Sequence, residues 1–255
     1  MKEESIDYGN WISNKRVYLF FVLSLICIII SFLPLHLFIK IILWIFSGIF
    51  ALTFLVILYF YCMFSKNNGE LQNKIRNIML EKLKWDGNGI ALDIGTGSGS
   101  LAISLAKKFP NSVVQAIDYW GKTWSYSKKM CEKNARLEGV GERVFFERAD
   151  ASKLPFEDVE FDAVISSFVF HEIKSIKNKK ELINEALRVL KKNGAFSFMD
   201  TFKNKKVYGD IEELKNSFSE FGIKEIEFAE VNEEIKLSRL MQLAFKNSAL
   251  FYGKK

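Results

Sequence analysis

Two long stretches without a charged side chain lie near the N-terminus of this 255-residue sequence. The first runs from Val17 to Ile39 (23 residues) and the second from Ile41 to Phe64 (24 residues), with only Lys40 between them. A helix of about 20 apolar residues crosses the hydrocarbon core of a bilayer, and it satisfies its own backbone hydrogen bonds there. Buried helices of soluble domains rarely remain free of charge over such lengths. The two stretches therefore predict a membrane hairpin.

The turn of this hairpin is expected at Pro34-Leu35-His36, which leaves spans at Val17–Leu33 and Lys40–Phe64. The first span is short for a full crossing, so a shallow re-entrant hairpin is the alternative. Apart from Lys40 at the start of the second span, neither span contains an acidic or basic residue that would suggest a transport path, and the hairpin is interpreted as an anchor. Basic residues flank the two stretches on the side away from the turn: Lys15, Arg16, Lys66, Lys74 and Arg76. The positive-inside rule then predicts a multi-pass protein of the cell membrane with both termini in the cytoplasm.

The rest of the chain, residues 65–255, has the composition of a soluble domain. It carries 32 Lys and Arg against 27 Asp and Glu, without the basic stripe that is typical of a nucleic-acid-binding protein. The three cysteines, Cys27, Cys62 and Cys131, have no metal-binding spacing. We therefore expect no bound metal and a reducing, cytosolic setting for this domain.

Strand and helix patterns alternate along this domain after a helix expected at Gly69–Lys84. Strands are expected at Ile90–Ile94, Val113–Ile117, Arg143–Glu147, Phe161–Ser167, Ala195–Met199, Ile223–Phe228 and Ala249–Tyr252. Helices are expected at Ser98–Phe109, Lys122–Leu137, Lys179–Lys192 and Ile211–Phe221, whereas Val231–Ser248 has no clear pattern. Such alternation predicts an α/β fold with an open, mostly parallel sheet covered by helices on both faces. The expected organisation is a tail (1–16), a two-helix anchor (17–64), a linker helix (65–88) and the α/β domain (89–255).

A glycine-rich loop follows the first expected strand and opens the first expected helix of the sheet. Gly95, Gly97 and Gly99 stand at alternate positions, where the backbone can turn sharply and approach a ligand closely. Asp118 ends the next strand, 25 positions after Asp93, where a carboxylate can accept hydrogen bonds from a ribose. A dinucleotide fingerprint would need a third glycine at position 100, which is Ser100. Asp93 would also repel a pyrophosphate, whereas it suits a cationic group.

The run from Asp93 to Gly99, acid-x-Gly-x-Gly-x-Gly, resembles the cofactor motif of the class I S-adenosylmethionine-dependent methyltransferases. The resemblance extends over about residues 70–255 and implies a Rossmann-like, seven-stranded sheet with the last strand antiparallel. It also implies S-adenosylmethionine as the cofactor. The residues that it implies for cofactor binding are Asp93, Gly95, Thr96, Gly97, Ser98, Gly99, Asp118, Tyr119, Asp150, Ala151 and Ser166.

Several of these assignments are specific to one part of the cofactor. Asp150 is expected to accept a hydrogen bond from the exocyclic amine of the adenine, and Ala151 to meet the ring edge with its N–H. The chain departs from the family after Asp118, where Tyr119 and Trp120 are bulkier than usual. One of these two is expected to pack against the adenine; for Trp124, packing between helix and sheet is an equal alternative.

The segment after the fourth strand, where the family binds the acceptor, contains His171. Its imidazole is the expected catalytic group, as a general base for a hydroxyl or enol acceptor, with Glu172 and Asp200 as alternatives. Phe168 and Phe170 are expected to line an apolar acceptor pocket or to pack in the core. The chain has no Asn-Pro-Pro-aromatic run and no Pro-Cys pair, which argues against a nucleic-acid substrate.

The expected function is methyl transfer to a small, apolar or lipid acceptor at the cytoplasmic face of a membrane. Two alternatives remain open from the sequence. One is a membrane-bound S-adenosylmethionine sensor or assembly protein without turnover, and the other is a nicotinamide-dependent oxidoreductase, which Asp93 and Ser100 disfavour.

Overall fold

A computed structural model describes residues 4–65, 70–121 and 126–255 of the chain. The chain divides into two compact units. One is Gly9–Gln72, and the other comprises the described residues of Met1–Tyr8 and of Asn73–Lys255. Expectations for Lys66, Gly69, Lys122 and Trp124 lie outside the described residues.

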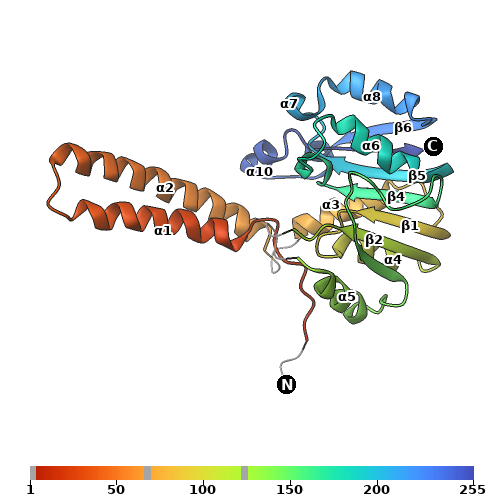
Figure 1. Ribbon diagram of the computed structural model, residues 1–255, viewed down its shortest axis with the longest axis horizontal. Helices are drawn as coiled ribbons and strands as arrows, with labels where there is room; N and C mark the ends of the chain where they lie inside the picture. The colour runs from red at the N-terminus through yellow and green to blue at the C-terminus, as the bar shows by residue number, and fades with distance from the viewer. Residues whose placement is uncertain (1–3, 66–69, 122–125) are drawn as a thin grey trace. The chain divides into compact units, whose positions relative to one another are not determined.

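The unit Gly9–Gln72 contains two antiparallel helices that pack along their lengths, α1 (Asn14–Ser31) and α2 (Leu37–Met63) (Figure 1). Each begins three residues before the expected span. The start of α2 is set by His36, whose Nδ1 accepts a hydrogen bond from the N–H of Phe38 at 3.3 Å. At 1.5 Å per residue, α1 is about 27 Å long and α2 about 40 Å long. Both are long and apolar enough to cross a membrane.

Between α1 and α2 mainly small polar residues are buried, whereas a helix pair in a soluble protein buries its large apolar residues. The buried residues of the two helices are Val17, Ser24, Ser31 and Ser47. Ser24 and Ser47 hydrogen-bond to each other between the helices, Oγ to Oγ, at 3.1 Å. Large apolar side chains point outward; Leu52, for example, is 65% exposed. Burial of small polar residues with apolar residues outside is typical of helices that pack in lipid, and α1 and α2 are candidate membrane spans.

The second unit is built on one seven-stranded sheet with the order β3-β2-β1-β4-β5-β7-β6. The strands are β1 (Gly89–Ile94), β2 (Ser112–Asp118), β3 (Val144–Arg148), β4 (Phe161–Ser167), β5 (Leu190–Asp200), β6 (Glu225–Glu230) and β7 (Ala249–Lys254). All neighbours pair in parallel except β7, which is antiparallel to both β5 and β6. The fold predicted from the sequence is confirmed, including the antiparallel insertion of the last strand.

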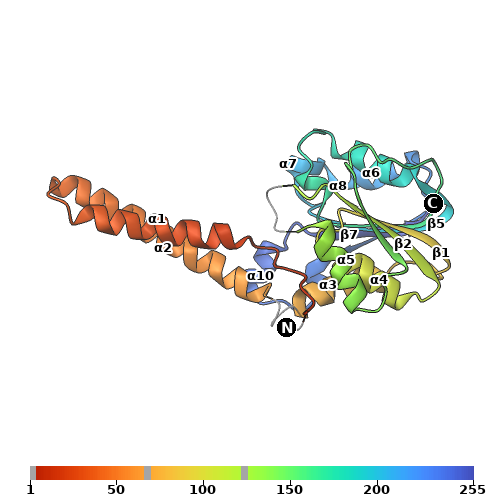
Figure 2. The same cartoon turned by 60° about the horizontal axis from the view of Figure 1, so that its bottom comes forward.

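Helices cover both faces of this sheet. They are α3 (Glu70–Glu81), α4 (Ser100–Lys108), α5 (Lys128–Leu137), α6 (Lys179–Arg188) and α8 (Ile211–Glu220). In Figure 2, α4 and α5 lie on one side of the sheet and α6 and α8 on the other. Leu182 and Ile183 of α6 and Phe218 of α8 pack with the strands in one large core cluster. The remaining elements are short: η2 (Phe170–Glu172), α7 (Lys205–Tyr208), α9 (Val231–Glu234) and α10 (Arg239–Ala244).

Most elements differ from their expected bounds by one to three residues at an end, and the larger or more informative differences have physical reasons. The helix expected at Lys179–Lys192 ends at Arg188, and Leu190 opens strand β5 because it pairs with Phe161 of β4. The first helix of the sheet begins at Ser100 rather than Ser98, because Gly99 adopts a left-handed conformation with φ of 81°. Helix α5 begins at Lys128, where the Ser127 hydroxyl accepts from the N–H of Met130. The patternless stretch 231–248 contains α9 and α10.

Candidate active site

The carboxyl ends of β1, β2, β4 and β5 meet at one edge of the sheet, since these strands are parallel. The strand order reverses beside β1: β2 follows on one side and β4 on the other. Open α/β sheets bind ligands outside the carboxyl ends of the strands at such a reversal. The candidate site is therefore the edge formed by the loops that follow these four strands.

The glycine loop lies at this edge and leaves no room for side chains. Its glycines have φ values of 72° (Gly95), 57° (Gly97) and 81° (Gly99), a region that L side chains rarely adopt. A Cβ at Gly95 would lie 2.2 Å from a Cγ atom of Val169. The N–H groups of Gly95 and Thr96 both donate to the carbonyl of Ile117, at 2.8 and 2.9 Å. The loop is thus bound to the end of β2 and packs directly on the segment after β4.

Asp118 holds this loop from the end of β2. Its Oδ2 accepts a hydrogen bond from the N–H of Gly97 at 2.9 Å, and its Oδ1 accepts from the N–H of Trp120 at 2.6 Å. A carboxylate offers about four lone-pair sites, so the two oxygens can also accept from the two hydroxyls of a ribose. The arrangement fits the role expected from the sequence and adds a second one, which is to fix the glycine loop.

The carbonyl of Gly97 accepts hydrogen bonds from two residues for which the sequence predicts no role in this loop. Trp120 donates its indole N–H to that oxygen at 2.9 Å, and Cys131 donates its thiol at 3.2 Å. Burial raises the pKa of Cys131 to about 12, with the charge of Asp118 adding to the effect, so the thiol stays protonated and donates. Trp120 therefore anchors the loop, and its packing against the adenine stays a prediction. No spacing pattern in the sequence signals either contact.

Asp93, at the end of β1, is a buried carboxyl group at this edge of the sheet, with one oxygen unpartnered in the part of the chain that the structure describes. It is 1% exposed, and its Oδ2 has no hydrogen-bond partner among the described residues; the same is true of the buried Thr96 hydroxyl. Burial raises the pKa of Asp93 to about 7, and the charge of Asp118 adds to this. A buried carboxylate oxygen without a partner is costly, and a nearby cationic group relieves that cost. S-adenosylmethionine carries an ammonium and a sulfonium, so these residues fit it.

The residues expected on the adenine side are more exposed. Tyr119 is 60% exposed, and its ring lies 4.8 Å from the Arg148 guanidinium. Asp150 is exposed, and its Oδ1 accepts from the N–H of Ser152 at 2.8 Å, which closes a local turn. Ala151 is half-buried beside it. These residues stand where an adenine could be contacted, but the described contacts of Asp150 are internal to its loop.

Two of the predicted residues also make contacts within the fold. Ser166 is fully buried, and its hydroxyl donates to the carbonyl of Ile94 at 3.1 Å, which ties β4 to the end of β1. Ser98 is buried, and its carbonyl accepts from the side-chain amide of Asn134 at 3.3 Å. The site residues that the structure brings together are therefore Asp93, the loop from Gly95 to Gly99, and Asp118.

His171 lies in η2 after β4 and pairs with Asp200 at the end of β5. The imidazole Nδ1 lies 2.6 Å from Asp200 Oδ1, and Nε2 lies 3.5 Å from a carboxylate oxygen of Glu172. Asp200 is fully buried, and its Oδ1 also accepts from the N–H of Thr201 at 2.6 Å. His171 and Asp200, offered as alternatives by the sequence, thus form one pair, in which Asp200 orients the ring.

The charge state of this pair follows from its surroundings. Burial lowers the pKa of His171, but the hydrogen bonds and charges of Asp200 and Glu172 outweigh it and raise the pKa to about 10. The ring therefore carries a proton on both nitrogens at neutral pH. A protonated imidazole cannot accept another proton, so at neutral pH this state does not suit the expected general base. It suits a donor to an oxygen that develops negative charge.

The charge state can be measured directly because the chain has only two histidines, His36 and His171. In a His36→Gln variant, a single set of imidazole signals should titrate in the NMR spectrum. We expect the midpoint near pH 10, with the protonated form present throughout the neutral range. A midpoint below pH 7 would contradict the assignment of a protonated His171.

One aromatic side chain, Phe168, lies next to His171. Phe168 has a left-handed backbone with φ of 57°, and its ring centroid lies 6.5 Å from that of His171 and 6.0 Å from that of Phe245, after α10. Phe170, in contrast, is fully buried and packs edge-on against Phe198 at 5.5 Å. Of the two expected pocket phenylalanines, Phe168 lies at the site and Phe170 belongs to the core.

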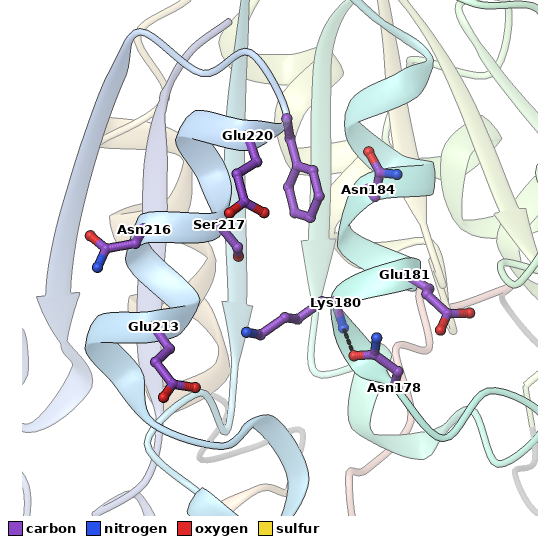
Figure 3. Close-up of a pocket in the computed structure, with 9 residues that line it drawn as sticks. Asn178, Lys180, Glu181, Asn184, Glu213, Asn216, Ser217 and Glu220 are labelled. Carbon is purple, nitrogen blue, oxygen red and sulfur yellow. Dashed lines mark hydrogen bonds between the residues drawn. The ribbon is translucent and has the colours of Figure 1, made fainter.

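A polar pocket elsewhere provides a useful comparison. Figure 3 shows it between α6 and α8, with Lys180 and Glu213 projecting from the two helices toward the space between them. None of the predicted site residues lines it. In the part of the chain that the structure describes, no group of three or more His, Cys, Asp or Glu side chains could hold a metal ion.

Comparison with known proteins identifies the domain. The family model described as "Methyltransferase domain" matches residues 92–198, from β1 through most of β5. The chain contains a class I S-adenosylmethionine-dependent methyltransferase domain. S-adenosylmethionine is its cofactor, as the glycine loop and Asp93 predicted. This result favours methyl transfer over the nicotinamide-dependent alternative.

Curated relatives of this methyltransferase domain include enzymes of quinone biosynthesis. The ubiquinone/menaquinone biosynthesis C-methyltransferase UbiE of Geotalea daltonii is 31% identical over 120 residues, which are 47% of this chain and 48% of that protein. The demethylmenaquinone methyltransferase of Lactobacillus johnsonii is 29% identical over 131 residues, 51% of each chain. The chain thus spans about half the length of these relatives.

Solved structures share the fold of the methyltransferase domain. Geranyl diphosphate C-methyltransferase from Streptomyces coelicolor A3(2), in complex with Mg²⁺, geranyl diphosphate and S-adenosyl-L-homocysteine, superposes with a TM-score of 0.56. The sequences are 11% identical, and the match covers 73% of this chain and 80% of that one. At this identity the likeness establishes the fold.

Proposed function

We propose that this protein transfers a methyl group from S-adenosylmethionine to a lipid-soluble acceptor, at a ring carbon of a hydroquinone. In this proposal, α1 and α2 anchor the chain in the cell membrane, and both termini and the methyltransferase domain lie on the cytoplasmic side. The basic residues outside the hairpin turn, such as Lys15 and Arg16, support that orientation. The outward-facing apolar surface of both helices supports the anchor.

Two further observations support an apolar acceptor. The relatives described above are named as C-methyltransferases of quinone biosynthesis, and quinones of that kind are dissolved in membranes. The ring of Phe168 also lies beside His171, and the ring of Phe245 packs on Phe168. An anchored enzyme meets a membrane-dissolved acceptor at a higher local concentration than a free enzyme does.

The observation that carries the proposal is the contact between Gly95 and Val169. It joins the cofactor loop to the segment 168–171, so the protonated His171 and the ring of Phe168 lie on the segment that packs against the cofactor loop. Methyl transfer requires donor and acceptor to be held in line and water to be excluded. An apolar segment with one oriented cation, placed against the cofactor loop, meets these requirements for a phenolic ring.

The chain's own residues have distinct tasks in this reaction. S-adenosylmethionine, when bound, supplies an electrophilic methyl group whose sulfur keeps the bonding electrons. Asp93 neutralises positive charge at the loop, and Asp118 accepts from sugar hydroxyls. A hydroquinone ring carbon becomes nucleophilic when its neighbouring hydroxyl gives its proton to water. Donation from His171 Nε2 stabilises the resulting oxyanion. After the new carbon–carbon bond has formed, the ring carbon gives its own hydrogen as a proton to water and the oxygen takes a proton back, so that one proton is released for each methyl group transferred.

The direct test is to incubate membranes containing the full chain with S-adenosylmethionine labelled in its methyl group. We expect the label in a product that extracts into organic solvent, and mass spectrometry should place the methyl on a ring carbon. Label found only in a water-soluble product would refute the lipid acceptor. Binding of the cofactor without any labelled product would instead support the sensor that the sequence leaves open.

Helix α10 offers a contact to the membrane surface next to the acceptor side. Leu240 and Leu243 are 43% and 62% exposed, and residues 236–246 carry three basic and no acidic side chains. Exposed leucines flanked by cations suit the surface of an anionic bilayer. Phe245 follows α10 directly and contacts Phe168, so an acceptor leaving the bilayer at α10 would meet the site.

The double variant Leu240→Glu/Leu243→Glu tests this contact. We expect about a tenfold loss of methyl transfer to a long-chain hydroquinone in vesicles, because two carboxylates oppose an anionic surface, and little change with a short-chain, water-soluble analogue. Leu137→Glu, at an exposed leucine at the end of α5, is the matched control. Equal losses on both acceptors would show that α10 does not deliver the acceptor from the membrane.

A further inference from the structure

The described N-terminal residues, Glu4–Tyr8, pack on the methyltransferase domain instead of extending as a free tail. We propose that this segment, here termed the strap, is a positioning element for the cofactor loop: when docked through Asn134, it holds the loop in its binding conformation. Strap docking and cofactor binding then strengthen each other. The proposal rests on the assignment of the glycine loop to S-adenosylmethionine.

Asn134 is the link between the strap and the loop. It lies in α5 and is fully buried. Its Oδ1 accepts from the N–H of Asp7 at 2.9 Å, and its Nδ2 donates to the carbonyl of Asp7 at 2.7 Å. The same Nδ2 donates to the carbonyl of Ser98 in the glycine loop at 3.3 Å. One side-chain amide thus binds both backbone groups of Asp7 and also a backbone group of the loop.

Contacts on either side of Asp7 fix the strap in register. The Tyr8 hydroxyl donates to Glu138 Oε1 at 2.9 Å, and the Arg76 guanidinium lies 5.6 Å from the centroid of the Tyr8 ring. Glu4 pairs with Arg136. Arg76 is itself buried and lies 3.5 Å from the Ser100 hydroxyl, at the start of α4. The strap therefore contacts α5 directly and reaches the start of α4 through Arg76.

The Asp7 side chain extends this contact toward the cofactor site. Burial raises the pKa of the Tyr126 hydroxyl, and the charges of Asp118 and Asp7 add to the effect, so Tyr126 lies near both carboxylates. A Cβ at Gly97 would lie 3.5 Å from the Tyr126 ring. Tyr126 thus lies beside the glycine loop, where the charge of Asp7 acts on its hydroxyl.

Coupling follows from the way in which the loop is held. Its carbonyls at Gly97 and Ser98 are fixed by Cys131, Trp120 and Asn134, and the Asn134 amide is oriented by the strap. If the strap detaches, a buried amide loses two partners, which is costly unless the side chain moves. Linkage requires the converse as well: a ligand that favours the ordered loop must favour the docked strap.

A pair of substitutions at position 7 isolates the strap contact without altering the domain interior. Asp7→Pro removes the backbone N–H that donates a hydrogen bond to Asn134 Oδ1. Asp7→Ala keeps that N–H and removes only the carboxylate. In the full chain, reconstituted in nanodiscs, we expect Asp7→Pro to raise the Kd for S-adenosylhomocysteine about fivefold to tenfold relative to Asp7→Ala, the effect of one lost backbone hydrogen bond.

Hydrogen exchange provides the readout that binding alone does not. In the unmodified chain, S-adenosylhomocysteine should slow amide exchange in a peptide covering residues 4–10, and this protection should be absent in Asp7→Pro. Equal Kd values for the two variants, with strap exchange unaffected by the ligand, would overturn the proposal. If the unmodified chain binds no S-adenosylhomocysteine, the cofactor assignment fails first and the strap's role fails with it.

Discussion

Replacing His171 by alanine is expected to lower the rate of methyl transfer about 100-fold or more, the usual cost of removing one donor to a developing oxyanion. The Kd for S-adenosylhomocysteine should stay within about twofold, because the described contacts of His171 are with Asp200, Glu172 and Phe168. His171→Gln retains a neutral donor and should recover part of the rate. Steady-state kinetics with a hydroquinone acceptor and calorimetry with S-adenosylhomocysteine measure the two effects.

The pH dependence distinguishes a donor from a base at this position. The raised pKa of His171 keeps its proton in place below about pH 10, so a donor role predicts a rate that is steady from pH 7 to 9 and falls as the proton is lost. Asp200→Asn removes the carboxylate that stabilises the charged ring, so the fall should move toward neutral pH. A rate in the unmodified enzyme that instead rises through pH 9 to 10, with the rise absent in His171→Ala, would identify His171 as a general base.

Gly95→Ala is expected to raise the Kd for S-adenosylhomocysteine by at least about 30-fold. A left-handed conformation costs a non-glycine residue roughly 1–2 kcal/mol, and the new Cβ would lie 2.2 Å from a Val169 methyl group. The loop or the segment after β4 must therefore move. Isothermal titration calorimetry measures the loss of affinity.

Gly139→Ala is the matched control for that substitution. Gly139 has nearly the same φ, 74°, but a Cβ there would meet no atom within 4 Å, and it lies just after α5. Gly139→Ala should lower the stability of the fold by a similar amount, because the backbone strain is the same, and should leave the Kd for S-adenosylhomocysteine unchanged. If Gly95→Ala binds S-adenosylhomocysteine as well as Gly139→Ala does, the close packing of the glycine loop is irrelevant to the cofactor.

The fold was predictable because its signals are local and periodic. Short apolar strands alternate with amphipathic helices, and β4 was predicted with its observed bounds, Phe161–Ser167. The helix predicted to extend through Leu190 ends earlier for a physical reason. The helical pattern of the sequence continues into the start of β5, but Leu190 pairs with Phe161 of the neighbouring strand and is therefore part of the sheet. Three-dimensional pairing overrides local periodicity there.

The site was predictable where a motif fixes the backbone and not where one side chain binds a distant carbonyl. The glycines and Asp118 come together as expected from their spacing after two adjacent strands. The strap on Asn134 and the hold of Trp120 on Gly97 join residues far apart in sequence through single hydrogen bonds. Such contacts leave no periodic trace, and the protonation of His171 depends on a partner, Asp200, that lies 29 residues away.

A calorimetric titration of the full chain with S-adenosylhomocysteine tests the cofactor site most directly, with Gly95→Ala and Glu213→Ala as the two variants. Glu213 lines the polar pocket between α6 and α8, well outside the predicted set of site residues. The glycine-loop site predicts one bound ligand per chain, binding weakened at least about 30-fold by Gly95→Ala, and no change with Glu213→Ala. Unchanged binding in Gly95→Ala together with loss of binding in Glu213→Ala would place the ligand elsewhere and contradict this account.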